Sequence, residues 1–137
     1  MAEGVGVERD ERRAADWLRR AAEGVVNAQH WYGRMLVEGR GVEQDLVEGR
    51  AWISRAAETG FMDSQVFLAE MLVNGRGGPR DHRVALDLFE RAANQGHVGA
   101  MFAIGALYGG GHDIETDRTV AQRWFRMRRS GDMPWRR

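Results

Sequence analysis

The chain repeats one pattern along nearly its whole length. The phrase that runs from Arg55 to Gly60 has close copies that end at Gly24 and Gly96, so the closing glycines lie 36 residues apart. A glycine-rich motif recurs in the same register, at 39–41, 75–77 and 109–111. A fixed period of this size is typical of stacked repeats, in which each unit buries its apolar face against its neighbours. The period therefore predicts an elongated repeat protein, and it favours a binding surface over a catalytic pocket.

Each period contains the pattern of two helices. Apolar residues spaced three and four apart predict a first helix near 27–38, with copies at 62–74 and 98–109. Small residues inside it mark where the second helix crosses closely: Ala28 with Gly33, Ser64 with Ala69, and Ala100 with Gly105. Within the second helix, Gly49 replaces the alanine of other copies and should cost about 1 kcal/mol of helix stability.

The limits of the second helix are also predictable. An aspartate side chain can accept hydrogen bonds from the first turn, and a left-handed glycine can end the last turn. The expected caps are Asp10, Asp45, Asp81 and Asp117, and the expected closing glycines are Gly24, Gly60 and Gly96.

The first residues match the middle of a repeat. The segment 4–10 is similar to 39–45, so we expect the chain to open on an inter-helix loop, with a helix near 11–23. That helix would lack its partner and leave Trp17 or Leu18 uncovered, to be covered by upstream sequence or by another chain. We expect seven helices in one domain. Its parts are a half repeat at 1–24, repeats at 25–60, 61–96 and 97–132, and a tail at 133–137.

The combined pattern resembles the Sel1-like repeat family, which is related to the tetratricopeptide repeats. The residues that carry the resemblance are Ala28-Gln29 with Gly33, Gly39-Arg40-Gly41-Val42 with Asp45, and Trp52 with Arg55-Ala56-Ala57-Glu58 and Gly60. The resemblance implies an all-α, right-handed α/α superhelix that scaffolds protein assemblies. The third copy departs from it at 109–114, where we expect Ile114 to replace the usual valine.

Composition narrows the possible functions. The chain has no cysteine, which excludes disulfides and thiolate zinc sites. It has no leader as written, so we expect a cytoplasmic location, with the periplasm open if the sequence is a fragment. The net charge is zero, but residues 118–137 contain seven arginines and one acidic residue. This basic end leaves a nucleic-acid or acidic-ligand binder as an alternative, through Arg123, Arg126, Arg128 and Arg129. A solvated helix end explains the same arginines.

The best candidates for partner contact lie on the first helices, opposite their core positions. The resemblance places this face on the concave side of the superhelix. Two aromatic residues occur there beside charged ones, as in protein-binding surfaces. The candidates are Trp31, Arg34, Phe67 and Glu70. The alternative is that both aromatic side chains pack on the adjacent repeat. Small residues in the third unit also predict a shallow pocket beside Phe67.

No catalytic, metal-binding or cofactor-binding residue is expected. The four histidines lack a recurring metal-ligand spacing, and His112 reads as a solvated loop residue. The three serines (Ser54, Ser64 and Ser130) lack the context of a nucleophile elbow. We therefore expect a non-catalytic protein. Hydrolase-like activity, as in a few family relatives, is a third alternative.

Overall fold

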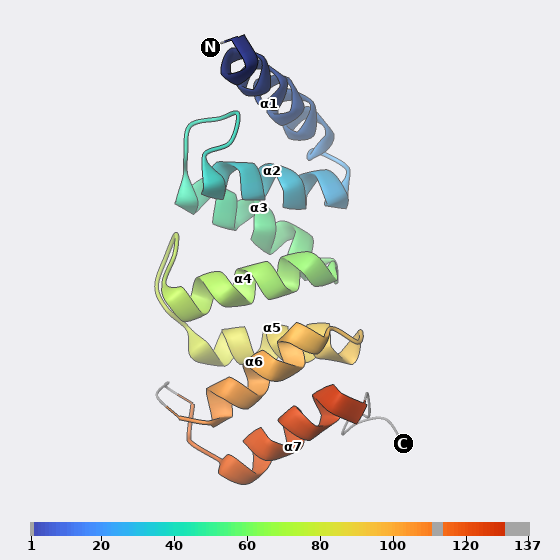
Figure 1. Cartoon of the computed structure of the whole chain (residues 1–137), viewed down its shortest axis with the longest axis vertical. Coiled ribbons are helices and arrows are strands. Elements are labelled where there is room, and N and C mark those ends of the chain that lie inside the picture. Colours follow the sequence, from blue (N-terminus) through green and yellow to red (C-terminus); the bar gives the residue numbers. More distant parts are fainter. Residues whose placement is uncertain (1, 111–113, 131–137) are drawn as a thin grey trace.

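Seven helices stack along one axis (Figure 1). The computed structural model describes residues 2–110 and 114–130, and side chains within 9–110 and 114–126. Within those residues the helices are α1 (Ala2–Ala21), α2 (Val26–Glu38), α3 (Leu46–Glu58), α4 (Met62–Asn74), α5 (His82–Asn94), α6 (Val98–Tyr108) and α7 (Arg118–Ser130), and there is no strand. Each helix packs against the next one in the chain. The predicted all-α solenoid of seven helices is confirmed.

Aspartate caps fix the starts of three helices as predicted. Asp45 accepts a hydrogen bond from the backbone N–H of Glu48 at 3.0 Å, and Asp81 accepts one from Val84 at 3.0 Å. Asp117 does the same with Val120 at 3.0 Å. Each carboxylate satisfies a backbone donor that the helix itself leaves unpaired.

The prediction for the start of the chain is wrong. α1 begins at Ala2, so the segment 4–10 is helical and not an inter-helix loop, and Asp10 lies inside a helix instead of capping one. The segment itself holds two glycines, which cost about 1 kcal/mol each in a helix, but it leads directly into the strong helix formers at 11–15, Glu-Arg-Arg-Ala-Ala. Further along α1, Trp17 is 67% exposed, as expected for the uncovered face, whereas Leu18 is half-buried.

Two of the three closing glycines behave as predicted. Gly60 and Gly96 have φ of 94° and 96°, but Gly24 does not adopt a positive φ. The phrase that ends at Gly24 is one residue shorter than its copies. As a result, the N–H of Val25 bonds the carbonyl of Ala21 in an ordinary helical turn, and no left-handed residue is needed.

The crossing of α2 and α3 explains the mid-helix glycine. A Cβ on Gly49 would lie 2.8 Å from the carbonyl oxygen of Gly33 and 2.7 Å from a methyl carbon of Val37. The small residues therefore do mark the close approach of the paired helices. Gly49 is needed there because an alanine would collide with the neighbouring backbone.

The loop glycines set the distance between successive repeats. Gly41 and Gly77 both have φ of 72°, and their backbones press on the preceding second helix, at Glu11 in α1 and Leu46 in α3. A side chain at either position would collide with a backbone carbonyl. The core itself runs through the stack and includes Ile53, Phe89 and Ile104, with Ile114 in the expected buried place.

Candidate functional site

Trp31, Arg34, Phe67 and Glu70 lie together on the face formed by α2 and α4. We call this surface the aromatic face. The guanidinium of Arg34 lies over two rings, 5.3 Å from the centroid of Trp31 and 5.1 Å from that of Phe67. Glu38, one turn further along α2, holds the same guanidinium through a 3.0 Å ion pair. Such cation–π contacts join the two helices and fix the positions of both rings.

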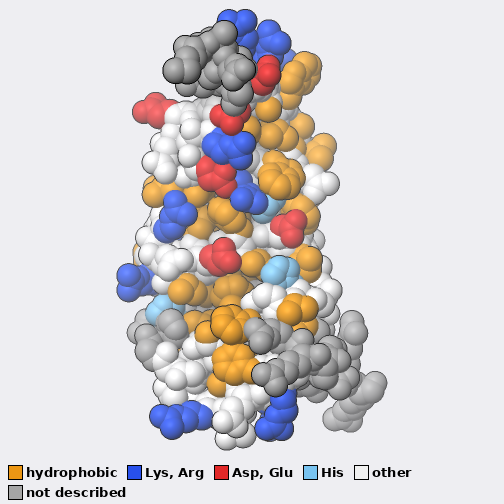
Figure 2. Space-filling view, viewed as in Figure 1, with side chains coloured by type: hydrophobic (Ala, Val, Ile, Leu, Met, Phe, Trp, Pro, Cys, Tyr) orange, Lys and Arg blue, Asp and Glu red, His pale blue; other side chains and the backbone are white. Residues whose placement is uncertain are grey.

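The two aromatic residues differ in exposure. Trp31 is 46% exposed, whereas Phe67 is half-buried and packs partly against the core. The alternative in which both rings pack away on the adjacent repeat therefore does not hold for Trp31. Figure 2 shows hydrophobic side chains on this side of the molecule, interspersed with arginine, acidic and histidine side chains.

Two hollows flank the stacked arginine. The first has a volume of about 220 Å³ and lies between α1 and α2. We call it the Leu18 hollow, and its lining is Leu18, Trp31, Arg34, Met35, Glu38 and Arg40. The second has a volume of about 360 Å³ and lies beside Phe67, where a shallow pocket is expected. We call it the Glu70 hollow; it includes Arg34, Asp63, Phe67, Glu70 and His97.

A buried histidine packs beneath the aromatic face. His30 is 1% exposed, and its Nδ1 lies 2.7 Å from the hydroxyl oxygen of Ser64, which is fully buried. Its ring meets Trp31 and Phe61 edge-on, with centroids 5.1 Å and 5.2 Å away. Burial lowers the pKa of His30 below its ordinary value, and the nearby Arg34 lowers it further.

Sequence reasoning missed His30, although the repeat contained a signal. The equivalent positions in the next two copies are Val66 and Phe102, so position 30 is an apolar position that carries a histidine. For Ser64, the sequence pattern predicts only a small residue at the close crossing of two helices. The two side chains form a polar contact inside the stack, and no substrate can reach a serine that has no exposed surface.

Glu70 carries a charge in an unfavourable environment. Partial burial raises its pKa, and this is opposed in part by His97 and Arg34. His97 accepts a 2.9 Å hydrogen bond at Nδ1 from the N–H of Ala100, which caps α6.

The structure describes only part of the basic end of the chain. Arg123 and Arg126 are exposed on α7, whereas the side chains of Arg128 and Arg129 lie outside the described residues, as does His112. Trp124 is 6% exposed and belongs to the core. An aromatic platform for stacking on bases is therefore not formed by Trp124.

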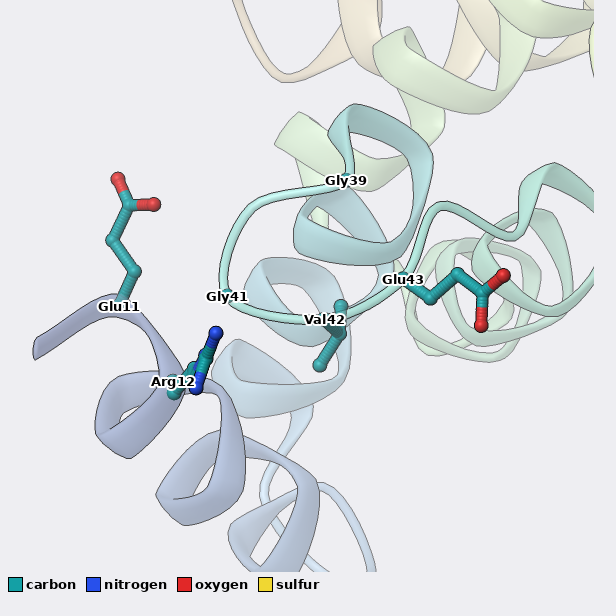
Figure 3. A pocket seen from close by; sticks show the side chains of 6 residues that line it. All are labelled: Glu11, Arg12, Gly39, Gly41, Val42 and Glu43. Atoms are coloured by element: carbon teal, nitrogen blue, oxygen red, sulfur yellow. The ribbon is translucent and has the colours of Figure 1, made fainter. Parts of the chain in front are cut away.

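A further hollow, with a volume of about 480 Å³, lies between α1 and the loop after α2. Figure 3 shows that Glu11 and Glu43, which line it, point away from each other on either side of the loop. Their carboxylates do not converge on one point. Over the described part of the chain, no cluster of His, Asp or Glu is arranged to hold a metal ion. The same residues contain no helix with the length and apolar character that crossing a membrane requires.

The stacked helix pairs define a helical-repeat protein. The family model of the Sel1 repeat matches residues 1–24, 26–61, 63–97 and 98–127. The chain therefore belongs to the Sel1 repeat family, which confirms the resemblance in the sequence. Proteins of this family are generally protein-interaction scaffolds without catalytic activity.

Solved structures agree with this assignment. A protective antigen of uropathogenic Escherichia coli with an SLR fold aligns with a TM-score of 0.83 and 30% identity, over 88% of this chain and 26% of its own. A Sel1 repeat protein from Oxalobacter formigenes aligns with a TM-score of 0.82 and 29% identity, over 88% of this chain and 51% of its own. Cysteine rich protein B of Helicobacter pylori aligns with a TM-score of 0.59 and 24% identity, over 63% of this chain and 65% of its own. The chain thus spans about a quarter of the length of the first structure and about half of the length of the second. A search of curated proteins finds no match.

Proposed function

We propose that this chain is a non-catalytic scaffold that binds a peptide or protein partner across the aromatic face. The observation that carries the proposal is the position of Trp31, which is large, 46% exposed and held in place by Arg34. A rigid aromatic side chain beside hollows is the kind of anchor that dominates protein interfaces. The membership of the family supports the same role.

The test is capture of partners from a lysate of the source organism, with the wild type beside a Trp31→Ala/Phe67→Ala variant. Circular dichroism and thermal melts of both must first show that they are folded. Val47→Ala is the control, because Val47 is an exposed apolar residue that lies on α3 outside the aromatic face. A protein that the wild type and Val47→Ala retain, and that the double variant loses, supports the proposal. Equal capture by all three contradicts it.

A further inference from the structure

We propose that the partner of the aromatic face presents a basic side chain to Glu70 and places a neighbouring apolar side chain in the Leu18 hollow. This inference rests on the proposed function and adds the chemistry of the partner. It follows from the unequal charge balance of the two hollows that meet at Arg34.

The Glu70 hollow contains a surplus of negative charge. Asp63 and Glu70 both line it, and among the residues that the structure describes neither forms an ion pair. The cation of the hollow, Arg34, is already paired with Glu38 at 3.0 Å. His97 also lines the hollow, and its Nδ1 is already engaged with the backbone N–H of Ala100. A partner that approaches this hollow therefore meets two carboxylates without a full counter-charge.

The two carboxylates are not equivalent. Asp63 lies in the first turn of α4, where a negative charge is stabilised by the helix N-terminus. Glu70 lies in the middle of the same helix and has no such support. Its pKa is raised because it is partly desolvated in the free protein, so an incoming cation would relieve an existing cost. Glu70 is therefore the main determinant of the charge preference.

The ring of Phe67 adds to this preference. Phe67 lines the Glu70 hollow, and the guanidinium of Arg34 lies 5.1 Å from its centroid. The contact shows that the geometry of this surface accommodates a cation beside an aromatic ring. An arginine or lysine of the partner would find the same combination of a carboxylate and an aromatic ring.

The Leu18 hollow has a different character. Its charges are satisfied, because Arg40 pairs with Glu11 at 3.2 Å and lies 3.6 Å from Glu38. What remains available is the surface of Leu18, Trp31 and Met35, which suits an apolar side chain. Since Arg34 lines both hollows, a basic and an apolar residue close together in the partner would fill them at once.

A random-peptide phage library tests the inference without knowledge of the natural partner. The library is selected on the wild type, and the affinities of the selected peptides are measured by fluorescence anisotropy. The variants are Glu70→Gln, which removes the charge and keeps the shape, and Glu58→Gln. Glu58 is an exposed glutamate on α3, and it serves as the matched control. The Trp31→Ala/Phe67→Ala variant reports whether a peptide binds the aromatic face.

We expect selected peptides that combine arginine or lysine with a large apolar residue. Glu70→Gln should weaken the binding of these peptides roughly tenfold, and Glu58→Gln should leave their affinity unchanged. Peptides that require Trp31 and Phe67 but carry no basic residue, or that tolerate Glu70→Gln, would overturn this inference and leave the proposed function intact. If no selected peptide depends on Trp31 and Phe67, the proposed function fails and the inference fails with it.

Discussion

The Nδ1 of His30 and the hydroxyl of Ser64 lie 2.7 Å apart, and this contact joins α2 to α4 inside the repeat stack. Both side chains are at most 1% exposed. Ser64→Ala would leave a buried imidazole nitrogen without its partner, so we expect a loss of about 1–3 kcal/mol of unfolding free energy. Urea denaturation measures it.

Ser54→Ala is the matched control for that experiment. The hydroxyl of Ser54 donates to the carbonyl of Arg50 in the same helix, a bond that adds nothing between repeats. Because alanine is the better helix former, this variant should be as stable as the wild type or slightly more so. An equal loss in both variants would show that the contact with His30 contributes nothing specific.

The buried His30 also predicts a pH dependence of stability. Its pKa is lowered in the folded state, first by burial and then by Arg34, although Asp63 opposes the shift. Below about pH 6.5, the ordinary value, the unfolded chain therefore binds the proton more readily than the folded chain. Stability should be full above that pH and should fall as the pH drops towards the lowered pKa of the folded state.

Urea midpoints between neutral and mildly acidic pH measure this dependence, with His30→Gln beside the wild type. Glutamine does not titrate, so the fall should be shallower in the variant. Its stability at neutral pH gives the reference for each curve. Parallel curves would assign the pH dependence to groups other than His30.

The loop glycines give a prediction about the spacing of the repeats. Gly77 combines a φ of 72° with a backbone that presses on Leu46, whereas Gly60 has a φ of 94° and open space where a Cβ would lie. Gly60→Ala should cost only the left-handed conformation, about 1–2 kcal/mol. Gly77→Ala adds a collision with the backbone of α3, which typically costs a further 1–3 kcal/mol or so. Thermal melts of the two variants should therefore differ clearly, and similar values would contradict the role of Gly77 as a contact between repeats.

Glu70→Gln should increase stability slightly at neutral pH. The pKa of Glu70 is raised, so the ionised carboxylate is less favourable in the folded chain than in the unfolded one. At low pH, where Glu70 is protonated, the chain has its full stability. As the pH rises through the raised pKa of Glu70, the carboxylate ionises and part of that stability is lost. The advantage of the variant should accordingly shrink as the pH falls. A destabilised variant at neutral pH would mean that Glu70 has a structural role that the pKa does not show.

The repeat period was sufficient to predict the helix pairs, and residue types within it predicted the caps at Asp45, Asp81 and Asp117. These features are local, because a capping aspartate acts on its own first turn. The start of α1 was mispredicted for the opposite reason. In the later copies, loop glycines are held by a preceding helix, as Gly77 is by α3. The similarity of the sequence at 4–10 to that at 39–45 is not sufficient by itself to form the loop.

The candidate site was predictable as a set of residues but not as an arrangement. Helical spacing places Trp31 and Arg34 on one face of α2, and the period places Phe67 on the equivalent face of α4. The position of the Arg34 guanidinium over both rings depends on how closely the two helices approach. That distance is set by buried contacts such as the one between His30 and Ser64, which cross between repeats and leave no local pattern.

A difference between the first two full repeats, 25–60 and 61–96, gives the last prediction. In the second repeat, Gln95 donates to the side-chain oxygen of Gln65 at 2.9 Å and to the carbonyl of Gly60 at 3.2 Å. The equivalent of Gln65 in the first is Gln29, whose side-chain oxygen is buried without a partner in the part of the chain that the structure describes. The equivalent of Gln95 is Thr59, which bonds only within its own turn, to Ala56 at 2.6 Å.

Exchanging these residues tests whether the missing donor matters. Thr59→Gln should supply the donor that Gln29 lacks and stabilise the chain by about 0.5–1.5 kcal/mol, the usual net value of a hydrogen bond. Gln95→Thr should create a second unpaired acceptor at Gln65 and destabilise the chain by about 1–3 kcal/mol. Urea denaturation of both variants measures the two effects. Opposite signs would support the comparison of the two contacts, whereas a loss in both would mean that the first contact has no room for the longer side chain.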